Sequence, residues 1–170
     1  MEQNLAQSIK EIGDFISSNG QKLAIAESCT GGLISSYFTD ISGASSYIEN
    51  CFVTYSENAK TKILGVKPET LEEYGVISEA VALEMVEGLK YHHGADYAIS
   101  TTGILGPDDI LFKGKLLPKG LVFIGLMTPN KTTYIKYIST CSTREEIKKD
   151  ITEHAIQSFC DLTRIKKSTL

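Results

Sequence analysis

One short segment constrains the fold more than any other: an apolar run, followed at once by a turn of small residues and then by a helical pattern. Residues 22–26 form the run, residues 28–32 (Ser-Cys-Thr-Gly-Gly) form the turn, and the apolar residues of 33–41 recur at helical spacing before Gly43. This pattern predicts a strand, a tight turn and a helix. Such a unit is typical of α/β folds, in which helices cover the faces of a sheet.

The same two patterns alternate along the rest of the chain. Further helices are predicted over residues 5–16, 56–65, 78–94 and 143–159, with a short one beginning at Pro68, and strands over residues 47–55, 97–102, 121–127 and 132–138. Ser56 and Ser78 are placed as N-caps, and Thr143 with Glu146 has the spacing of a capping box. Residues 166–170 are expected to fray.

The last two predicted strands are separated by Pro129-Asn130-Lys131, which favours a hairpin and therefore an antiparallel pair. A chain of 170 residues is long enough for one domain with its own core and short for two. We therefore predict an α/β fold: a single-domain, layered α/β/α arrangement with a mixed sheet over residues 1–170.

Composition narrows the classes of function. The formal net charge is −4, which disfavours nucleic acid as the main partner, and no stretch approaches the ~20 apolar residues of a membrane span. The first residues lack the pattern of a secretory signal, and the four cysteines form no pair with metal or disulfide spacing. These features predict a soluble, cytoplasmic protein with reduced thiols that acts on a small molecule, without nucleic acid or membrane.

The turn at 28–32 is the first candidate site. Amide N–H groups at the start of a helix can bind an anion or oxyanion, and Thr30, Gly31 and Gly32 are placed to offer them. The hydroxyl of Ser28 would then lie within reach of a bound carbonyl, as acyl transfer requires. The simpler alternative is that Ser28 or Thr30 only caps the helix.

A serine nucleophile needs a base. The histidines at 92, 93 and 154 lie at or inside predicted helices without a matching acid, so Lys60 is the better candidate, since burial can lower its pKa enough to supply a neutral amine. The alternative for Lys60 is a solvated helix lysine. Cys29 is a rival nucleophile, although a buried packing cysteine is the commoner fate of such a residue.

Residues 103–119 form the one long stretch without a predicted element, which exceeds the usual length of a connection and marks a candidate binding loop. Its start, Gly-Ile-Leu-Gly, has the spacing of a nucleic-acid-binding loop. Because Pro107-Asp108-Asp109 follows and the surroundings are not basic, we discount that function.

Several segments, taken together and in order, resemble the CinA C-terminal domain family. The resemblance covers roughly residues 5–162 and is closest to stand-alone nicotinamide-nucleotide amidases of that family. The segments that carry it are Ala26-Glu27-Ser28-Cys29-Thr30-Gly31-Gly32, Val53-Thr54-Tyr55-Ser56, Ala59-Lys60, Leu64-Gly65-Val66 and Thr102-Gly103-Ile104-Leu105-Gly106-Pro107.

The resemblance implies hydrolysis of the carboxamide of nicotinamide mononucleotide to nicotinic acid mononucleotide and ammonia, without a metal or another cofactor. It implies that Ser28 is the nucleophile and that Tyr55 and Lys60 are catalytic. The substrate-contact positions that it implies, beside the turn residues, are Thr102, Gly103 and Arg144. It also implies a homo-oligomer.

Two segments depart from the family pattern. Residues 108–119 replace a glycine-rich loop, and Lys148-Lys149 stands where the family has an arginine pair. Lysine lacks the planar fork with which arginine binds phosphate bidentately. Two alternatives therefore stay open: a non-catalytic nucleotide-binding relative, and an amidase for another small amide.

Overall fold

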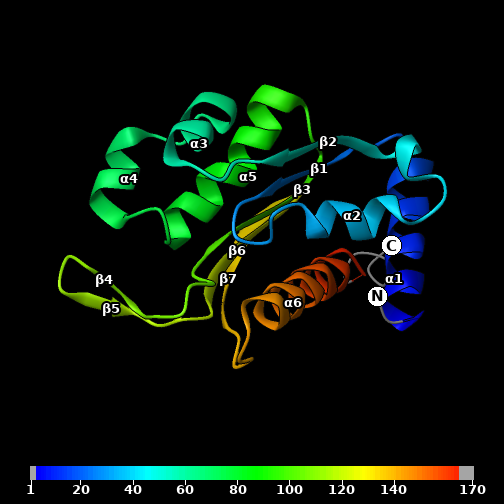
Figure 1. Ribbon diagram of the computed structural model, residues 1–170. Coiled ribbons are helices and arrows are strands. Elements are labelled where there is room, and N and C mark those ends of the chain that lie inside the picture. Colours follow the sequence, from blue (N-terminus) through cyan, green and yellow to red (C-terminus); the bar gives the residue numbers. More distant parts are fainter. Residues whose placement is uncertain (1–2, 165–170) are drawn as a thin grey trace.

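The computed structural model describes residues 3–164, in which helices and strands alternate (Figure 1). The helices are α1 (Gln3–Ser18), α2 (Leu33–Thr39), α3 (Glu57–Leu64), α4 (Pro68–Tyr74), α5 (Glu79–His93) and α6 (Arg144–Arg164), with a 3-10 turn η1 (Ala44–Ser46). The strands are β1 (Leu23–Glu27), β2 (Ile48–Val53), β3 (Tyr97–Gly103), β4 (Ile110–Phe112), β5 (Lys115–Leu117), β6 (Leu121–Thr128) and β7 (Lys131–Ile138). The tail predicted to fray, 166–170, lies outside the described residues.

Five strands form one mixed sheet in the order β2-β1-β3-β6-β7. β1 is parallel to both of its neighbours, whereas β6 is antiparallel to β3 and to β7. The predicted hairpin joins β6 to β7. The mixed sheet is thereby confirmed, and its parallel half consists of the three strands that end beside the candidate nucleophile.

The sheet separates two layers of helices (Figure 1): α1, α2 and α6 lie on one face, and α3, α4 and α5 on the other. Successive side chains of a strand point to opposite faces, so β1 contributes to both layers. Its Leu23 and Ile25 pack in the core under α1 and α6, and its Ala24 and Ala26 pack against α5. The predicted three-layer α/β/α fold is confirmed.

The predicted helix caps are present. The Ser56 hydroxyl accepts a hydrogen bond from the Ala59 amide at the start of α3, and Ser78 caps α5 through Val81. At α6, the Thr143 amide donates to the Glu146 carboxylate, while the Glu146 amide donates to the Thr143 hydroxyl. This reciprocal pair is a capping box, which fixes where α6 begins.

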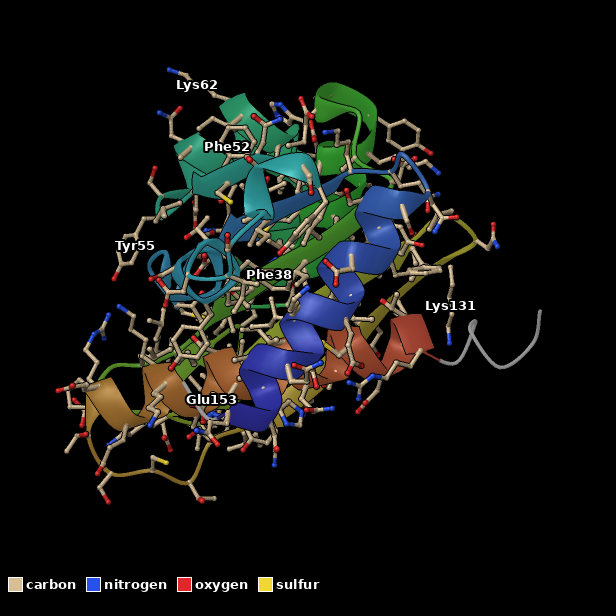
Figure 2. All side chains as sticks on the ribbon, turned by 90° about the vertical axis from the view of Figure 1, so that its right-hand side faces the viewer. Phe38, Phe52, Tyr55, Lys62, Lys131 and Glu153 are labelled. Carbon is tan, nitrogen blue, oxygen red and sulfur yellow. The ribbon has the colours of Figure 1, made fainter. Side chains whose placement is uncertain are left out.

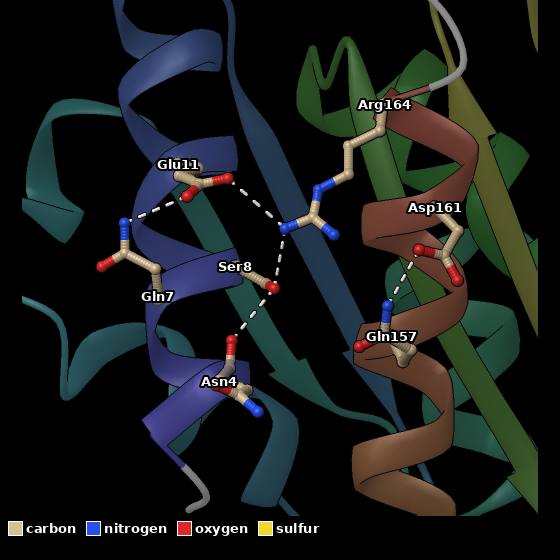
Figure 3. A network of polar contacts seen from close by, with 7 residues as sticks. All are labelled: Asn4, Gln7, Ser8, Glu11, Gln157, Asp161 and Arg164. Carbon is tan, nitrogen blue, oxygen red and sulfur yellow. Dashed lines mark hydrogen bonds and ion pairs between the residues drawn. The ribbon is translucent and has the colours of Figure 1, made fainter.

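The first and last helices are joined by polar contacts (Figure 3). The Arg164 guanidinium donates to the Ser8 hydroxyl over 2.8 Å and lies 3.4 Å from the Glu11 carboxylate. Together with the apolar contacts beneath, these bonds hold the end of α6 against α1. The first turn of α6 lies at the opposite end of the helix, at the edge of the sheet that carries the candidate site.

The sequence predicted no helix or strand over residues 103–119. In the structure, β4 and β5 form a small antiparallel hairpin within this segment. Lys113 (φ 48°) and Gly114 (φ 77°) make its two-residue turn, and positive φ at both positions is what a tight hairpin turn requires. Strands of three residues are too short to show an alternation of apolar and polar residues, so this alternation did not predict the hairpin. Phe112 packs over Gly75 and anchors the hairpin to the end of α4.

Gly88 of α5 lets α3 approach closely, and α3 carries Lys60. A Cβ at position 88 would overlap the carbonyl group of Leu64 at the end of α3. We expect Gly88→Ala to lower the free energy of unfolding by about 1–3 kcal/mol, although alanine is the better helix former. Urea unfolding measures this change, with Glu87→Ala on the exposed side of α5 as the control. A Gly88→Ala protein as stable as the wild type would show that α3 is not held in this way.

Candidate active site

The site lies at one edge of the sheet, where the parallel strands end. Ser28 follows β1, Thr54 follows β2, and Thr102 stands at the end of β3. β7 runs in the same direction, so α6, which follows it and begins at Arg144, starts at the same edge. In sheets of this kind the carboxyl ends of the strands are where ligands bind. The topology thus brings together residues from four segments that are distant in the chain.

These residues surround a cavity of about 430 Å³. Ser28, Tyr55, Thr102, Gly103 and Arg144, which the sequence singled out, all line it. The other lining residues are Cys29, Val76, Ile77, Ile104, Leu105, Gly106, Pro107, Asp108, Asp109 and Ile110. The β3–β4 loop therefore gives the cavity both apolar side chains and the two carboxylates of Asp108 and Asp109.

Lys60 and Ser28 are in direct contact. The Lys60 side chain is fully buried, and its Nζ lies 3.0 Å from the Ser28 Oγ and 2.7 Å from the Thr54 carbonyl oxygen. Thr54 is held in turn, because its amide donates to the Glu27 carbonyl over 2.8 Å. The backbone of Thr54 therefore fixes the amine beside the hydroxyl, and the alternative of a solvated lysine is wrong.

Burial lowers the pKa of Lys60 to about 8, since an ammonium group is poorly solvated there, while nearby Glu57 opposes the shift. A neutral amine is thus accessible near physiological pH. It can donate one N–H to the Thr54 carbonyl and direct its lone pair at the Ser28 hydroxyl. This is the arrangement of an activated nucleophile, with a base that is oriented by a third group.

The turn after Ser28 is organised by a buried carboxylate. Glu27 is fully buried, and its two oxygens accept hydrogen bonds from the amides of Gly32 (3.0 Å), Ile34 (3.1 Å) and Ser35 (2.8 Å). The Ser35 hydroxyl donates to the same carboxylate over 2.6 Å. The first amides of α2 are therefore already occupied.

This arrangement corrects two predictions. Gly32 has no free amide to offer to a substrate, because Glu27 takes it. The alternative that Ser28 or Thr30 caps the helix is also wrong, since the N-cap residue is Gly32 and the first amides of α2 donate to the Glu27 carboxylate. The Glu27 carboxylate, rather than a hydroxyl, accepts the hydrogen bonds of these amides. The hydroxyl of Ser28 is therefore not used in capping.

The remaining donors of the turn differ from one another. The Gly31 amide donates weakly to the Ser28 carbonyl over 3.2 Å, whereas the Thr30 amide has no acceptor within residues 3–164. The Thr30 side chain is buried and shares a hydrogen bond with the Thr101 hydroxyl. Within the described chain, the Thr30 amide is thus an unpaired backbone donor of the turn, but Thr30 is fully buried and is not among the residues that line the cavity.

Tyr55 lies on the rim of the cavity and not beside Lys60. Its ring is 64% exposed, and its hydroxyl accepts a hydrogen bond from Arg144 Nη2 over 3.2 Å. Figure 2 shows Tyr55 projecting from the surface on the side where α6 begins. The structure therefore pairs Tyr55 with Arg144 at the cavity mouth, whereas Ser28 and Lys60 form the pair inside.

Cys29 also lines the cavity, but it is poorly suited as a nucleophile. The thiol is buried, and this burial raises its pKa to about 12. The reactive form of cysteine is the thiolate, which is therefore scarce at neutral pH. Between the two neighbours, the geometry favours Ser28, because it has a base in contact.

Thr102 and Gly103 shape the far wall of the cavity. The Thr102 hydroxyl donates to the Val76 carbonyl over 2.6 Å and ties β3 to the segment before α5. A Cβ at Gly103 would lie 2.6 Å from the Leu121 carbonyl oxygen, so this glycine is required by the close approach of β6. Both positions therefore have packing roles as well as a place in the lining.

Glu27 and Thr54 are the functional residues that the sequence reasoning missed as such. Glu27 could have been found from the sequence, because it is a charged residue placed between the apolar run and the turn at residues 28–32. Thr54 could not have been found in this way, because it contacts Lys60 through its backbone carbonyl and not through its side chain. The three histidines do not line the cavity, and residues 3–164 contain no cluster of three His, Cys, Asp or Glu side chains that could hold a metal ion.

We expect Glu27→Gln to destabilise the fold. Half of the carboxylate becomes an amide that cannot accept a hydrogen bond, so buried donors of α2 lose their acceptor, at a cost of about 2–4 kcal/mol. Urea unfolding at neutral pH measures the loss. Glu49→Gln, an exposed position on β2, is the matched control. Equal stability of the two variants would mean that Glu27 does not organise the turn.

Comparison with known proteins gives a consistent result. The model of the CinA C-terminal domain family matches residues 5–163. A CinA-like protein of Chloroherpeton thalassium is 48% identical over 72% of this chain, which spans 28% of that protein. The Escherichia coli protein named nicotinamide-nucleotide amidohydrolase PncC is 35% identical, over 91% of this chain and 92% of its own length.

Solved structures agree. The crystal structure of the competence/damage inducible protein CihA from Agrobacterium tumefaciens superposes with a TM-score of 0.86 at 31% identity, and the match covers 95% of this chain and 97% of that one. A CinA superfamily protein from Escherichia coli gives 0.84 at 25% identity. The three-layer architecture is therefore the one that these relatives have.

Proposed function

This chain belongs to the CinA C-terminal domain family, and we propose that it hydrolyses the carboxamide of nicotinamide mononucleotide to nicotinic acid mononucleotide and ammonia. The contact between Lys60 Nζ and Ser28 Oγ at the cavity carries the proposal, because it supplies a base to a serine that faces a space of suitable size. The name of the Escherichia coli relative, which matches over nearly its whole length, supports this choice of substrate.

In the first half of the reaction, the neutral amine of Lys60 takes the proton of Ser28. The Ser28 oxygen attacks the carboxamide carbon, and we assign the oxyanion to the turn, where the Thr30 amide has no other acceptor within residues 3–164. The carbon–nitrogen bond then breaks. Lys60 returns the proton to the leaving nitrogen, which departs as ammonia and leaves an acyl ester on Ser28.

In the second half, a water molecule attacks the ester carbon. Lys60 accepts a proton from the water, and the same proton is returned to the Ser28 oxygen when the ester bond breaks. The products are the carboxylic acid and the free enzyme. No electron transfer takes place, and each proton that Lys60 accepts it also returns.

The rim of the cavity contacts the rest of the substrate in this proposal. Tyr55 and Arg144, joined by their hydrogen bond, stand at the mouth, and Thr102 with Gly103 form the opposite wall. Asp108 and Asp109 also line the cavity. These two carboxylates favour a second candidate, an amidase for a small amide that lacks a phosphate, because they repel anions.

Ammonia release tests the proposal and separates the candidates. We expect the wild-type protein to release ammonia fastest from nicotinamide mononucleotide in a panel that also contains nicotinamide and aliphatic amides. Faster release from an uncharged amide would favour the second candidate. Calorimetric binding of the mononucleotide without any ammonia would instead indicate a non-catalytic nucleotide-binding protein.

The proposal includes a homo-oligomer in the cytoplasm whose partner is a pyridine mononucleotide. The name of the Escherichia coli relative supports the pyridine mononucleotide as the partner, and the oligomeric state and the location stay predictions. No helix within residues 3–164 is both long and apolar enough to cross a membrane. Sedimentation of the purified protein tests the oligomeric state, and a sedimentation coefficient of a monomer would contradict it.

A further inference from the structure

We propose that Lys148 binds the phosphate of the substrate together with Arg144, and that this pair makes the site selective for phosphorylated amides. The inference rests on the proposed function, since it concerns a second part of the same site. The groups near Ser28 differ in whether they are free to receive an anion.

The N-terminus of α2 is not free. A turn with two glycines before a helix is where an anion would ordinarily be sought, but the Glu27 carboxylate takes the amides of Gly32, Ile34 and Ser35. Its negative charge also offsets the positive end of the helix dipole. A phosphate placed there would have to displace a buried carboxylate.

Most other cations near the site are already used. Lys60 is buried and bonded to Ser28 and Thr54. The Lys119 Nζ donates to the Ser142 carbonyl, and Lys149 forms an ion pair with Glu153 at 3.9 Å. Each of these three ammonium groups already has a hydrogen-bond or ion-pair partner, so each has fewer donors left for a phosphate.

Lys148 is different. It is half-buried on α6, and within residues 3–164 its ammonium group has no carboxylate within ion-pair distance. A Cβ built on Gly31 would lie 3.5 Å from its Nζ, so the ammonium stands directly against the glycine of the Ser28 turn. The lack of a side chain at Gly31 keeps the space beside this ammonium open.

Arg144 and Lys148 lie on one face of α6. Residues four apart are neighbours on a helix surface, and one turn advances about 5.4 Å. Arg144 lines the cavity and donates to Tyr55, and Lys148 continues the row toward Gly31. Two like charges in this relation repel each other. A phosphate between them removes the repulsion and accepts hydrogen bonds from both.

The carboxamide and the phosphate of a mononucleotide then bind at two different parts of the site. The carboxamide reaches Ser28 inside the cavity, and the phosphate stays at the mouth, beside the first two turns of α6. Asp108 and Asp109 line the same cavity from the β3–β4 loop, and a phosphate is repelled wherever it comes close to them. The positive charges of Arg144 and Lys148 therefore favour the orientation in which the phosphate lies against α6.

The test compares two substrates that differ only by the phosphate: nicotinamide mononucleotide and nicotinamide riboside. The readout is the ratio of their kcat/KM values in the wild type, Lys148→Met and Lys149→Met. We expect the wild type to prefer the mononucleotide, and Lys148→Met to lower the ratio about tenfold, as the loss of one charge-assisted hydrogen bond does. Lys149 is the neighbouring lysine and is paired with Glu153. Lys149→Met should therefore keep the wild-type ratio.

An unchanged ratio in Lys148→Met, or an equal fall in Lys149→Met, would overturn the inference. If the wild type releases no ammonia from either compound, the proposed function fails by itself. The same two compounds are then titrated into the three proteins by calorimetry. A preference for the mononucleotide that depends on Lys148 would still support the phosphate site, and binding without preference would refute it. Lys148→Gln replaces Lys148→Met if the methionine variant does not fold.

Discussion

Replacing Ser28 with alanine is expected to abolish ammonia release from nicotinamide mononucleotide, with a fall in kcat of about 10⁴-fold or more. Among the residues that line the cavity, Ser28 has a hydroxyl in contact with a lysine amine, since Lys60 Nζ lies 3.0 Å away. The substitution removes one oxygen atom that takes no part in capping α2, so the fold should be kept. Ammonia release under saturating substrate measures the effect, and urea unfolding verifies the stability.

Cys29→Ala is the matched control for this prediction. The two residues are adjacent, and both line the cavity, but burial raises the pKa of the Cys29 thiol to about 12. We therefore expect the cysteine variant to retain ammonia release within about tenfold of the wild type. Loss of activity in Cys29→Ala with full activity in Ser28→Ala would assign the nucleophile to the thiol.

Replacing Lys60 with methionine is the second large effect, with an expected fall in kcat of about 10³-fold or more. Methionine fills the buried space and lacks the amine that takes the Ser28 proton. The matched control is Lys62→Met: Lys62 is on the same helix but is exposed and points away from the molecule (Figure 2). Lys62→Met should release ammonia at the wild-type rate. Equal activity of Lys60→Met and Lys62→Met would exclude Lys60 as the base.

The pH dependence follows from the same residue. The active form of Lys60 is the neutral amine, and burial lowers its pKa to about 8. The fraction of neutral amine rises as the pH increases toward this value and then saturates. Wild-type kcat/KM, which reports the pKa values of the free enzyme, should therefore rise with pH and level off above about 8. Activity that falls over this range would mean that the protonated lysine is the form that acts.

Much of the fold could be predicted from the sequence because its determinants are local. The apolar runs at β1 and β3 and the helical spacing in α1 and α5 reflect burial, and each falls close to the observed element. Caps are local as well: Ser56, Ser78 and the Thr143 pair all act within three residues. The short β4–β5 hairpin was missed, because its apolar residues are too few to show a period.

The candidate site was only partly predictable. Pattern alone allowed Lys60 to be a solvated lysine, and the burial that lowers its pKa depends on the approach of α3 to α5 around Gly88. The Tyr55–Arg144 hydrogen bond joins residues far apart in the chain, so no local pattern reports it. The occupied amides of α2 depend on the direction in which the Glu27 side chain points, which the sequence does not encode visibly.

A crystal structure of Ser28→Ala with bound nicotinamide mononucleotide tests the central claim most directly. We expect the carboxamide carbon to lie about 3 Å from the position of the missing oxygen, near Lys60, with the phosphate at Arg144 and Lys148. A phosphate bound at the turn of residues 28–32, with the carboxamide directed toward solvent, would contradict it.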